Sequence, residues 1–301
     1  MFYYSSIGDP ILFWVLRLVV FLSLLLSGYL ITFKDKDGKW YWKYSSIGII
    51  IYSLVEGLRW NRGVDYPHYY QDLTGKLFTD YSEYVYVWWT ELFKFTGLPY
   101  WIAFIFYSFL LIHGFCCLMK HFKKQAIWAL PLFFIISVGS SENLIRQFIA
   151  VSMFEYALYY FLEKKYVRSA VFAILTVQTH NSVLLTIAGG LFVHFVKFDK
   201  MIKNGYVLVV IYLFMYYFWD PSYLTPITTW MSSLSVGDSS NMSGYLENAE
   251  FWFSDESSLS DRLGYMSRAA SMFSSAMSLI TTCIIIKYGY DLTQKNERYR
   301  I

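Results

Sequence analysis

The sequence predicts an all-α membrane protein, a polytopic helical bundle of about 8–10 membrane segments. It is 56% hydrophobic and 22% aromatic with a mean hydropathy of +0.37, and only 16% of its residues are charged, whereas a soluble domain carries about 25%. Its apolar residues fall into runs long enough to cross a ~30 Å hydrocarbon layer, and short lysine-rich segments separate several of these runs. We therefore expect one integral membrane domain over residues 1–301.

The first predicted span covers Ile11–Phe33. It has no lysine or arginine before it and no small-residue cleavage site after it, so we expect it to be retained rather than removed as a signal peptide. Its one charged residue, Arg17, either snorkels to the interface or pairs within the bundle. The three cysteines lie in predicted spans without metal-ligand spacing, so we expect neither a disulfide nor a bound metal.

Five lysine-rich segments predict the orientation, because basic residues concentrate on the cytoplasmic side. They hold 17 of the 25 lysines and arginines. The segments are 34–43, 120–124, 164–168, 197–203 and 287–300. If all five are cytoplasmic, the N-terminus lies outside the cell and residues 288–301 form a cytoplasmic tail.

Further spans follow from the apolar runs between these segments. They are Tyr44–Leu58, Tyr100–Met119, Ala126–Val138, Asn143–Leu162, Gly205–Trp219 and Tyr265–Lys287. The region 168–196 is the exception, because its long apolar run has basic flanks on both sides. We expect two shorter helices that meet near Gln178–Ser182, about 18 Å into the membrane, where a polar break must be buried in protein or line a cavity. The alternative is one long tilted span.

The basic residues differ between the two predicted sides. Lysines outnumber arginines 14 to 3 in the cytoplasmic segments, but arginines outnumber lysines 5 to 2 outside them, with Arg17 left aside. Arginine binds phosphate through a planar two-point fork, which lysine lacks. The outward arginines therefore predict a lipid-linked phosphate or pyrophosphate ligand. These arginines are Arg59, Arg62, Arg146, Arg262 and Arg268. The alternative is contact with lipid head groups or ion pairing with four nearby acids, Glu56, Asp65, Glu142 and Glu155.

Asn143, Arg146 and Gln147 recur at helical spacing, which predicts a polar stripe on one span. We expect the preceding residues, from Ser140 on, to cap that helix, so that its N-terminus and Arg146 together favour an anion. His180, at the predicted break, is either a hydrogen-bonded structural group or a general base. Asp65 is the rival base, or the group that orients the acceptor.

Two polar regions are expected to face outward. Residues 59–99 combine a loop with an amphipathic helix in the interface, near 80–96. Residues 220–264 hold seven acids and one base, and we expect them to form a loop over the cavity. The aromatic residues of this loop either stack on sugar rings or rest in the membrane interface.

Two segments resemble the EpsG-like family of Wzy-type polysaccharide polymerases. The first, RWNRGVDYPHYY at Arg59–Tyr70, is similar to the family's outward loop, with an arginine, Gly-x-Asp and a following tyrosine such as Tyr69. The second runs from Glu142 to Leu185 and has the family's Asn, Arg-Gln, Ala, lysine-rich turn and His-then-Ser order. One residue, Asn181, separates His180 from Ser182, which is a small departure from the family pattern.

The resemblance implies a bacterial enzyme of the cytoplasmic membrane with a GT-C-like glycosyltransferase architecture. It would join oligosaccharide repeat units carried on undecaprenyl diphosphate, on the outer face. The sequence has no Asp-x-Asp motif, so we expect neither a metal nor another cofactor. The polymer would be an O-antigen, a capsule or an exopolysaccharide. The expected partners are the lipid-linked repeat unit, membrane lipids and a chain-length regulator, and no nucleic acid. The candidate catalytic residues are His180 and Asp65. Those for substrate binding are Arg59, Arg62, Arg146, Gln147, Asn143, Tyr69 and Arg268, of which Arg268 rests on its predicted outward position alone.

Three other functions use similar residues. A transporter or flippase of lipid-linked oligosaccharides would need the same cations but no base, and it would favour internal repeats. A related O-antigen ligase would transfer a finished chain instead of extending one. A membrane acyltransferase could also use His180.

The predicted orientation can be tested by cysteine labelling in intact cells. An impermeant maleimide should label Gly63→Cys and Ser240→Cys, and should not reach Asp37→Cys or Phe122→Cys until the membrane is opened. Labelling of Asp37→Cys from outside would contradict the orientation.

Overall fold

The structure is a computed structural model that describes residues 8–59, 62, 65–75, 83–180 and 183, with 207, 210 and 214. The chain divides into two compact units, Met1–Gly190 and Leu191–Ile301, and the helices below belong to the first. The described residues are mostly helical and contain no strand. The helices are α1 (Gly8–Tyr29), η1 (Leu30–Lys34), α2 (Tyr41–Gly57), α3 (Tyr66–Thr74), α4 (Tyr84–Thr96), α5 (Tyr100–Met119), η2 (Lys120–Gln125), α6 (Ala126–Ser141), α7 (Ile145–Leu162) and α8 (Tyr166–Thr179).

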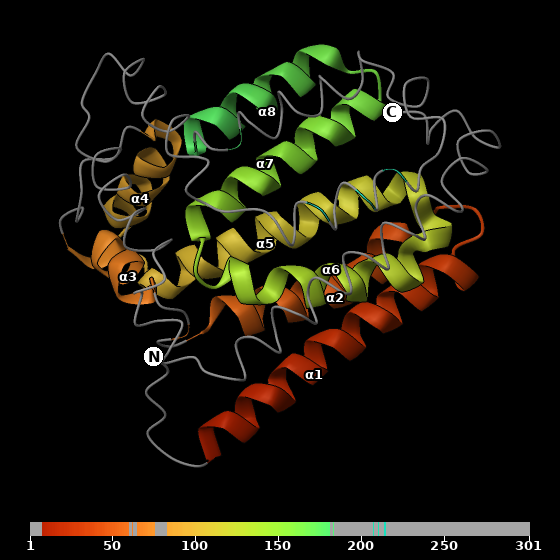
Figure 1. Ribbon diagram of the computed structural model, residues 1–301, viewed down its shortest axis with the longest axis horizontal. Coiled ribbons are helices and arrows are strands. Elements are labelled where there is room, and N and C mark those ends of the chain that lie inside the picture. The colour runs from red at the N-terminus through yellow and green to blue at the C-terminus, as the bar shows by residue number, and fades with distance from the viewer. Residues whose placement is uncertain are drawn as a thin grey trace. The chain divides into compact units, whose positions relative to one another are not determined.

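Six long helices lie side by side, and the short helices α3 and α4 lie near one end of them (Figure 1). Helix α5 is central, because α2 packs against it on one side and α7 on the other. Helix α1 packs on α2 and α6, and α8 packs on α7. One apolar core fills the space among α1, α2, α5 and α6 around Leu24, Tyr52 and Leu130. A second core lies among α3, α4, α5 and α7 around Tyr86 and Phe104.

Two helical stretches, Ile11–Lys34 and Tyr100–Ser141, are long and apolar enough to cross a membrane. The second stretch is 42 residues long and turns back on itself at η2, where Phe122 leaves the helical conformation (φ −124°, ψ 41°). Helix α1 leaves large apolar side chains uncovered, with Trp14 65% exposed. Such a surface is stable against lipid and costly in water. These features indicate a membrane protein.

The structure describes the first helix of the predicted broken pair and the point at which that helix ends. Helix α8 ends at Thr179, and His180 adopts an extended conformation (φ −160°, ψ 117°). The second predicted helix of this pair lies outside the described residues. Of the predicted span Gly205–Trp219, only residues 207, 210 and 214 are described. The predicted span Tyr265–Lys287, the loop 220–264 and the tail 288–301 lie wholly outside the described residues.

Among the described residues, the lysine-bearing turns near 34–43, 120–124 and 164–168 lie at one end of the helices, and Arg59, Arg62 and Arg146 lie at the other (Figure 1). At one end Thr32 donates a hydrogen bond to the carbonyl of Lys123 (3.0 Å), and His121 of η2 lies 3.2 Å from Glu163 in the turn between α7 and α8. The other end holds Arg59, Arg62 and Arg146, whose contacts are described below. This separation agrees with the charge pattern of the sequence, and which end faces the cytoplasm stays a prediction.

Close helix packing depends on glycine at the contact of α1 with α6. A Cβ at Gly28 would lie 2.5 Å from the carbonyl oxygen of Ala126 and 2.7 Å from the Cα of Ile127. Both are backbone atoms, so the helices themselves would have to separate. Small residues serve this purpose at many membrane helix contacts.

We expect Gly28→Ala to destabilise the protein by about 1–3 kcal/mol through overpacking, seen as a lower melting temperature in detergent. Gly139→Ala is the matched control, because Gly139 is also helical and a Cβ there meets nothing within 4 Å. Equal melting temperatures for the two variants would contradict the close contact.

Candidate functional site

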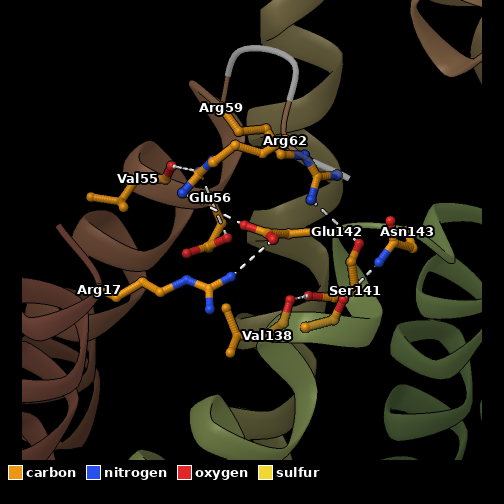
Figure 2. A network of polar contacts seen from close by, with 10 residues as sticks. Arg17, Val55, Glu56, Arg59, Arg62, Val138, Ser141, Glu142 and Asn143 are labelled. Carbon is orange, nitrogen blue, oxygen red and sulfur yellow. Dashed lines mark hydrogen bonds and ion pairs between the residues drawn. The ribbon is translucent and has the colours of Figure 1, made fainter. Parts of the chain in front are cut away.

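A first charged network joins α1, the C-terminal end of α2 and the turn between α6 and α7 (Figure 2). Glu142, in that turn, accepts a hydrogen bond of 2.9 Å from the Nη2 of Arg17, and its other oxygen lies 3.5 Å from the Nη1 of Arg62. Arg62 also lies 3.8 Å from the carboxylate of Glu56. Of the two alternatives for Arg17, pairing within the helices is the one observed.

Arg59 and Arg62, both predicted to bind phosphate, make internal contacts in this network. Arg62 donates a hydrogen bond of 2.7 Å to the carbonyl of Val55. Arg59 is only 6% exposed, donates to the carbonyl of Ser141 (3.3 Å) and lies over the ring of Phe104. Ion pairing of Arg62 with Glu56 and Glu142 therefore matches the alternative weighed for the outward arginines. Phosphate binding by Arg59 and Arg62 stays a prediction.

This first network has the character of a structural clamp. Charges removed from water must be paired, since an unpaired charge in such a place is strongly destabilising. A small cavity of about 20 Å³, lined in part by Tyr52, Glu56, Arg59 and Ser141, is large enough for about one water molecule and too small for a sugar or a phosphate. The clamp fixes α1, α2 and the α6–α7 turn relative to one another.

A second network lies at the same end and centres on Glu83, the residue before α4. One carboxylate oxygen of Glu83 is paired with the Nη1 of Arg146, on the first turn of α7. Its other oxygen is hydrogen-bonded to the Nδ1 of His180, directly after α8. The three side chains are largely buried, with exposed fractions of 8% for Glu83, 19% for Arg146 and 13% for His180. The structure thus brings Arg146 and His180 together through an acid that the sequence analysis did not select.

Helix α3 contributes the predicted residue Tyr69 to this network. Tyr69 is 5% exposed, and burial raises the pKa of its hydroxyl, whereas the charge and hydrogen bonding of Arg146 lower it. Asp65 precedes α3 and acts weakly on the same hydroxyl. The described contacts of His180 go to Glu83 and not to Asp65. Helix α3 is fixed to α4 by a hydrogen bond of 2.9 Å from the hydroxyl of Tyr86 to Asp72.

The electrostatic state of Glu83 follows from its two partners. Burial raises the pKa of a carboxyl group, but the hydrogen bond of His180 and the charge of Arg146 outweigh that effect, so the pKa of Glu83 lies below its ordinary value. Glu83 is therefore ionised at neutral pH. The charge of Arg146 balances the charge of Glu83, and His180 lies beside this carboxylate.

The remaining predicted site residues have different positions. Helix α7 begins at Ile145 and makes no side-chain cap contact, while Ser141 ends α6, so the predicted cap from Ser140 to Asn143 is wrong. Asn143 lies in the α6–α7 turn instead of the α7 stripe and donates to the carbonyl of Gly139 (3.1 Å). Gln147 lies on the first turns of α7 and is half-buried. Arg268 lies outside the described residues.

An apolar cavity of about 530 Å³ lies among α4, α5, α7 and α8. Its walls include Tyr84, the residue directly after Glu83, and Trp88 from α4, with Met153 of α7 and Leu175 of α8. Helices α4, α7 and α8 therefore carry the charged network at or beside their ends and the cavity along their length. Within the described part of the chain, no group of three or more histidine, cysteine or acidic side chains could hold a metal ion.

Comparison with known proteins gives one match. No curated protein and no solved structure matches the chain. The sequence profile of the EpsG family matches residues 42–298, a range that contains Glu83, Arg146 and His180 and most of the chain. The chain therefore belongs to the EpsG family.

Proposed function

We propose that the protein is a membrane glycosyltransferase of the Wzy type. It would polymerise oligosaccharide repeat units carried on undecaprenyl diphosphate, on the extracytoplasmic face, and release undecaprenyl diphosphate. Membership of the EpsG family implies a polysaccharide polymerase-like role. The observation that carries the finer proposal is the buried Arg146–Glu83–His180 network beside a large apolar cavity.

The network and the cavity together suit a lipid with a charged head. Arg146 lies seven residues before Met153 and ten before Tyr156, both of which line the cavity. Because an α-helix rises 1.5 Å per residue, the cavity lies about 10–15 Å further along α7 than the backbone of Arg146. A hydrocarbon chain can occupy an apolar cavity of this kind, while a diphosphate can approach the arginine.

The proposed reaction assigns one role to each residue. The oxygen of the acceptor sugar hydroxyl forms a bond to the anomeric carbon of the growing chain. The bond from that carbon to the diphosphate oxygen breaks, and its electron pair stays on the diphosphate oxygen. His180 takes the hydroxyl proton on Nε2, for which the described residues supply no hydrogen-bond partner. Arg146 stabilises the negative charge that develops on the diphosphate. Asp65 is assigned to orient the acceptor.

The proposal extends to the membrane topology. Helices α1, α2, α5, α6 and α7 would cross the bilayer, and α8 would enter it and stop at His180, in a GT-C-like bundle. Exposed apolar side chains on α1, α6 and α8, such as Ile136 (77%) and Ile174 (62%), support lipid contact around these helices. The arginine-bearing end would face outward because the lysine-bearing turns would be cytoplasmic.

The direct test is turnover of a purified lipid-linked repeat unit by the purified protein. A polymerase gives a ladder of longer lipid-linked products and free undecaprenyl diphosphate. A protein that only moves the lipid across vesicles gives no ladder and would refute the proposed chemistry.

We expect Arg146→Lys to fold and to lower polymerisation roughly ten- to hundredfold. Lysine can keep the charge beside Glu83 but loses the second, parallel hydrogen bond to phosphate, and a charged hydrogen bond is worth about 1.5–3 kcal/mol. Ladder formation measures the loss. Arg168→Lys, at the opposite end of the helices, is the control and should retain activity, whereas near-full activity of Arg146→Lys would show that Arg146 is a structural cation.

We expect His180→Gln to lower turnover by about 10²- to 10⁴-fold, because glutamine keeps a hydrogen-bonding side chain but cannot accept the proton. Binding of the lipid substrate should stay near normal. His121→Gln is the control, since His121 lies in η2 at the opposite end of the helices, 3.2 Å from Glu163. If Asp65→Asn abolishes turnover while His180→Gln scarcely slows it, Asp65 is the base and the assignment of His180 fails.

A further inference from the structure

Glu83 occupies a helix-start position without capping the helix. It is the N-cap residue of α4, yet its side chain makes no cap hydrogen bond. An acid at this position normally accepts a hydrogen bond from the first turn of its own helix. Here both carboxylate oxygens are used by residues of other helices, Arg146 and His180. Helix capping therefore does not explain why the carboxylate is buried at this point.

The contact with His180 is made through one particular ring nitrogen. Nδ1 faces the carboxylate, so the neutral ring must carry its proton on Nδ1 and keep Nε2 unprotonated. A carboxylate in this position holds the ring orientation and stabilises the imidazolium that forms when Nε2 takes a proton. Its effect resembles that of the outer acids that orient histidines in other sites.

We infer that Glu83 is the positioning residue of the site, which holds His180 with Nε2 free for the acceptor proton and fixes Arg146 beside it. The inference rests on the proposed function, in which His180 is the base. Glu83 itself touches neither the sugar nor the diphosphate. A single carboxylate thereby sets the separation of the proton acceptor and the phosphate ligand.

Two tyrosines, an arginine and an acid paired with a histidine are the other ionisable groups in and around this network. Burial raises the pKa values of Tyr86 and Tyr69, so both stay neutral, and Arg146 stays charged. Asp72 is fully buried and pairs with Tyr86 and with His68, at 3.9 Å. His68 is thus a second histidine of this region, and it needs a control variant of its own.

The main test is the kcat of Glu83→Gln, which keeps the size of the side chain and removes its charge. Without the carboxylate, the ring of His180 is no longer held with Nε2 toward the acceptor, and the imidazolium that forms on proton transfer loses its counter-charge. We expect kcat to fall about 10- to 100-fold.

Three variants serve as controls. Glu91→Gln removes an exposed acid of α4 that pairs with Lys94 and should leave kcat unchanged. His68→Gln should also keep the kcat of the unmodified protein. In the double variant Glu83→Gln/His180→Gln, the loss of turnover should be smaller than the product of the two single losses, because the part of the effect of Glu83 that acts through His180 is already gone.

The outcomes separate the two proposals. Normal turnover of His180→Gln refutes the base, and the positioning role falls with it. Slow turnover of His180→Gln with an unchanged kcat in Glu83→Gln, or single losses that multiply in full in the double variant, overturns the positioning role alone.

A test without catalysis covers the case in which Glu83→Gln does not fold. The chain has five histidines, so ¹⁵N-histidine spectra of the unmodified protein in nanodiscs can be assigned by comparison with His180→Gln. We expect the neutral ring of His180 to carry its proton on Nδ1. A proton on Nε2 would overturn the inference.

Discussion

The requirement that buried charges be paired governs this structure. Arg17 in the middle of α1 and charged residues at or beside the ends of α2, α4 and α7 are largely buried, and an isolated charge there would cost several kcal/mol. At this end of the helices, two separate networks pair these charges. One holds Arg17, Arg62, Glu56 and Glu142 together, and the other holds Arg146 and His180 on Glu83.

The two networks differ in the room that they leave for a ligand. In the first, the acids lie in the middle and the arginines contact carboxylates, backbone carbonyls and aromatic rings, next to a cavity the size of one water. In the second, one acid serves two partners and the neighbouring cavity is far larger. A cavity the size of one water leaves no room for a sugar or a diphosphate, whereas a large apolar cavity can hold a lipid chain. The second network is for this reason the better candidate for substrate.

Local patterns in the sequence predicted the helices well. The apolar run Tyr100–Met119 is helix α5 at both ends, and the polar break placed at His180 by charge alone is where α8 stops. The start of α7 was predicted wrongly, because serines before a helix are typical caps. In the structure Ser141 instead completes the last turn of α6, and its backbone carbonyl accepts a hydrogen bond from Arg59.

Glu83 could not be predicted from the sequence, because its partners are distant along the chain. Arg146 lies 63 residues away and His180 lies 97, and no local spacing connects the three. One signal was present: Glu83 begins an amphipathic helix whose inner face packs on α8, and α8 ends at the predicted break. An interfacial helix explains the apolar residues of α4, but it does not explain a buried acid at its start. The acid is explained by the side chains of Arg146 and His180, which converge on it, so the chemistry of the site depends on tertiary packing and not on any single motif.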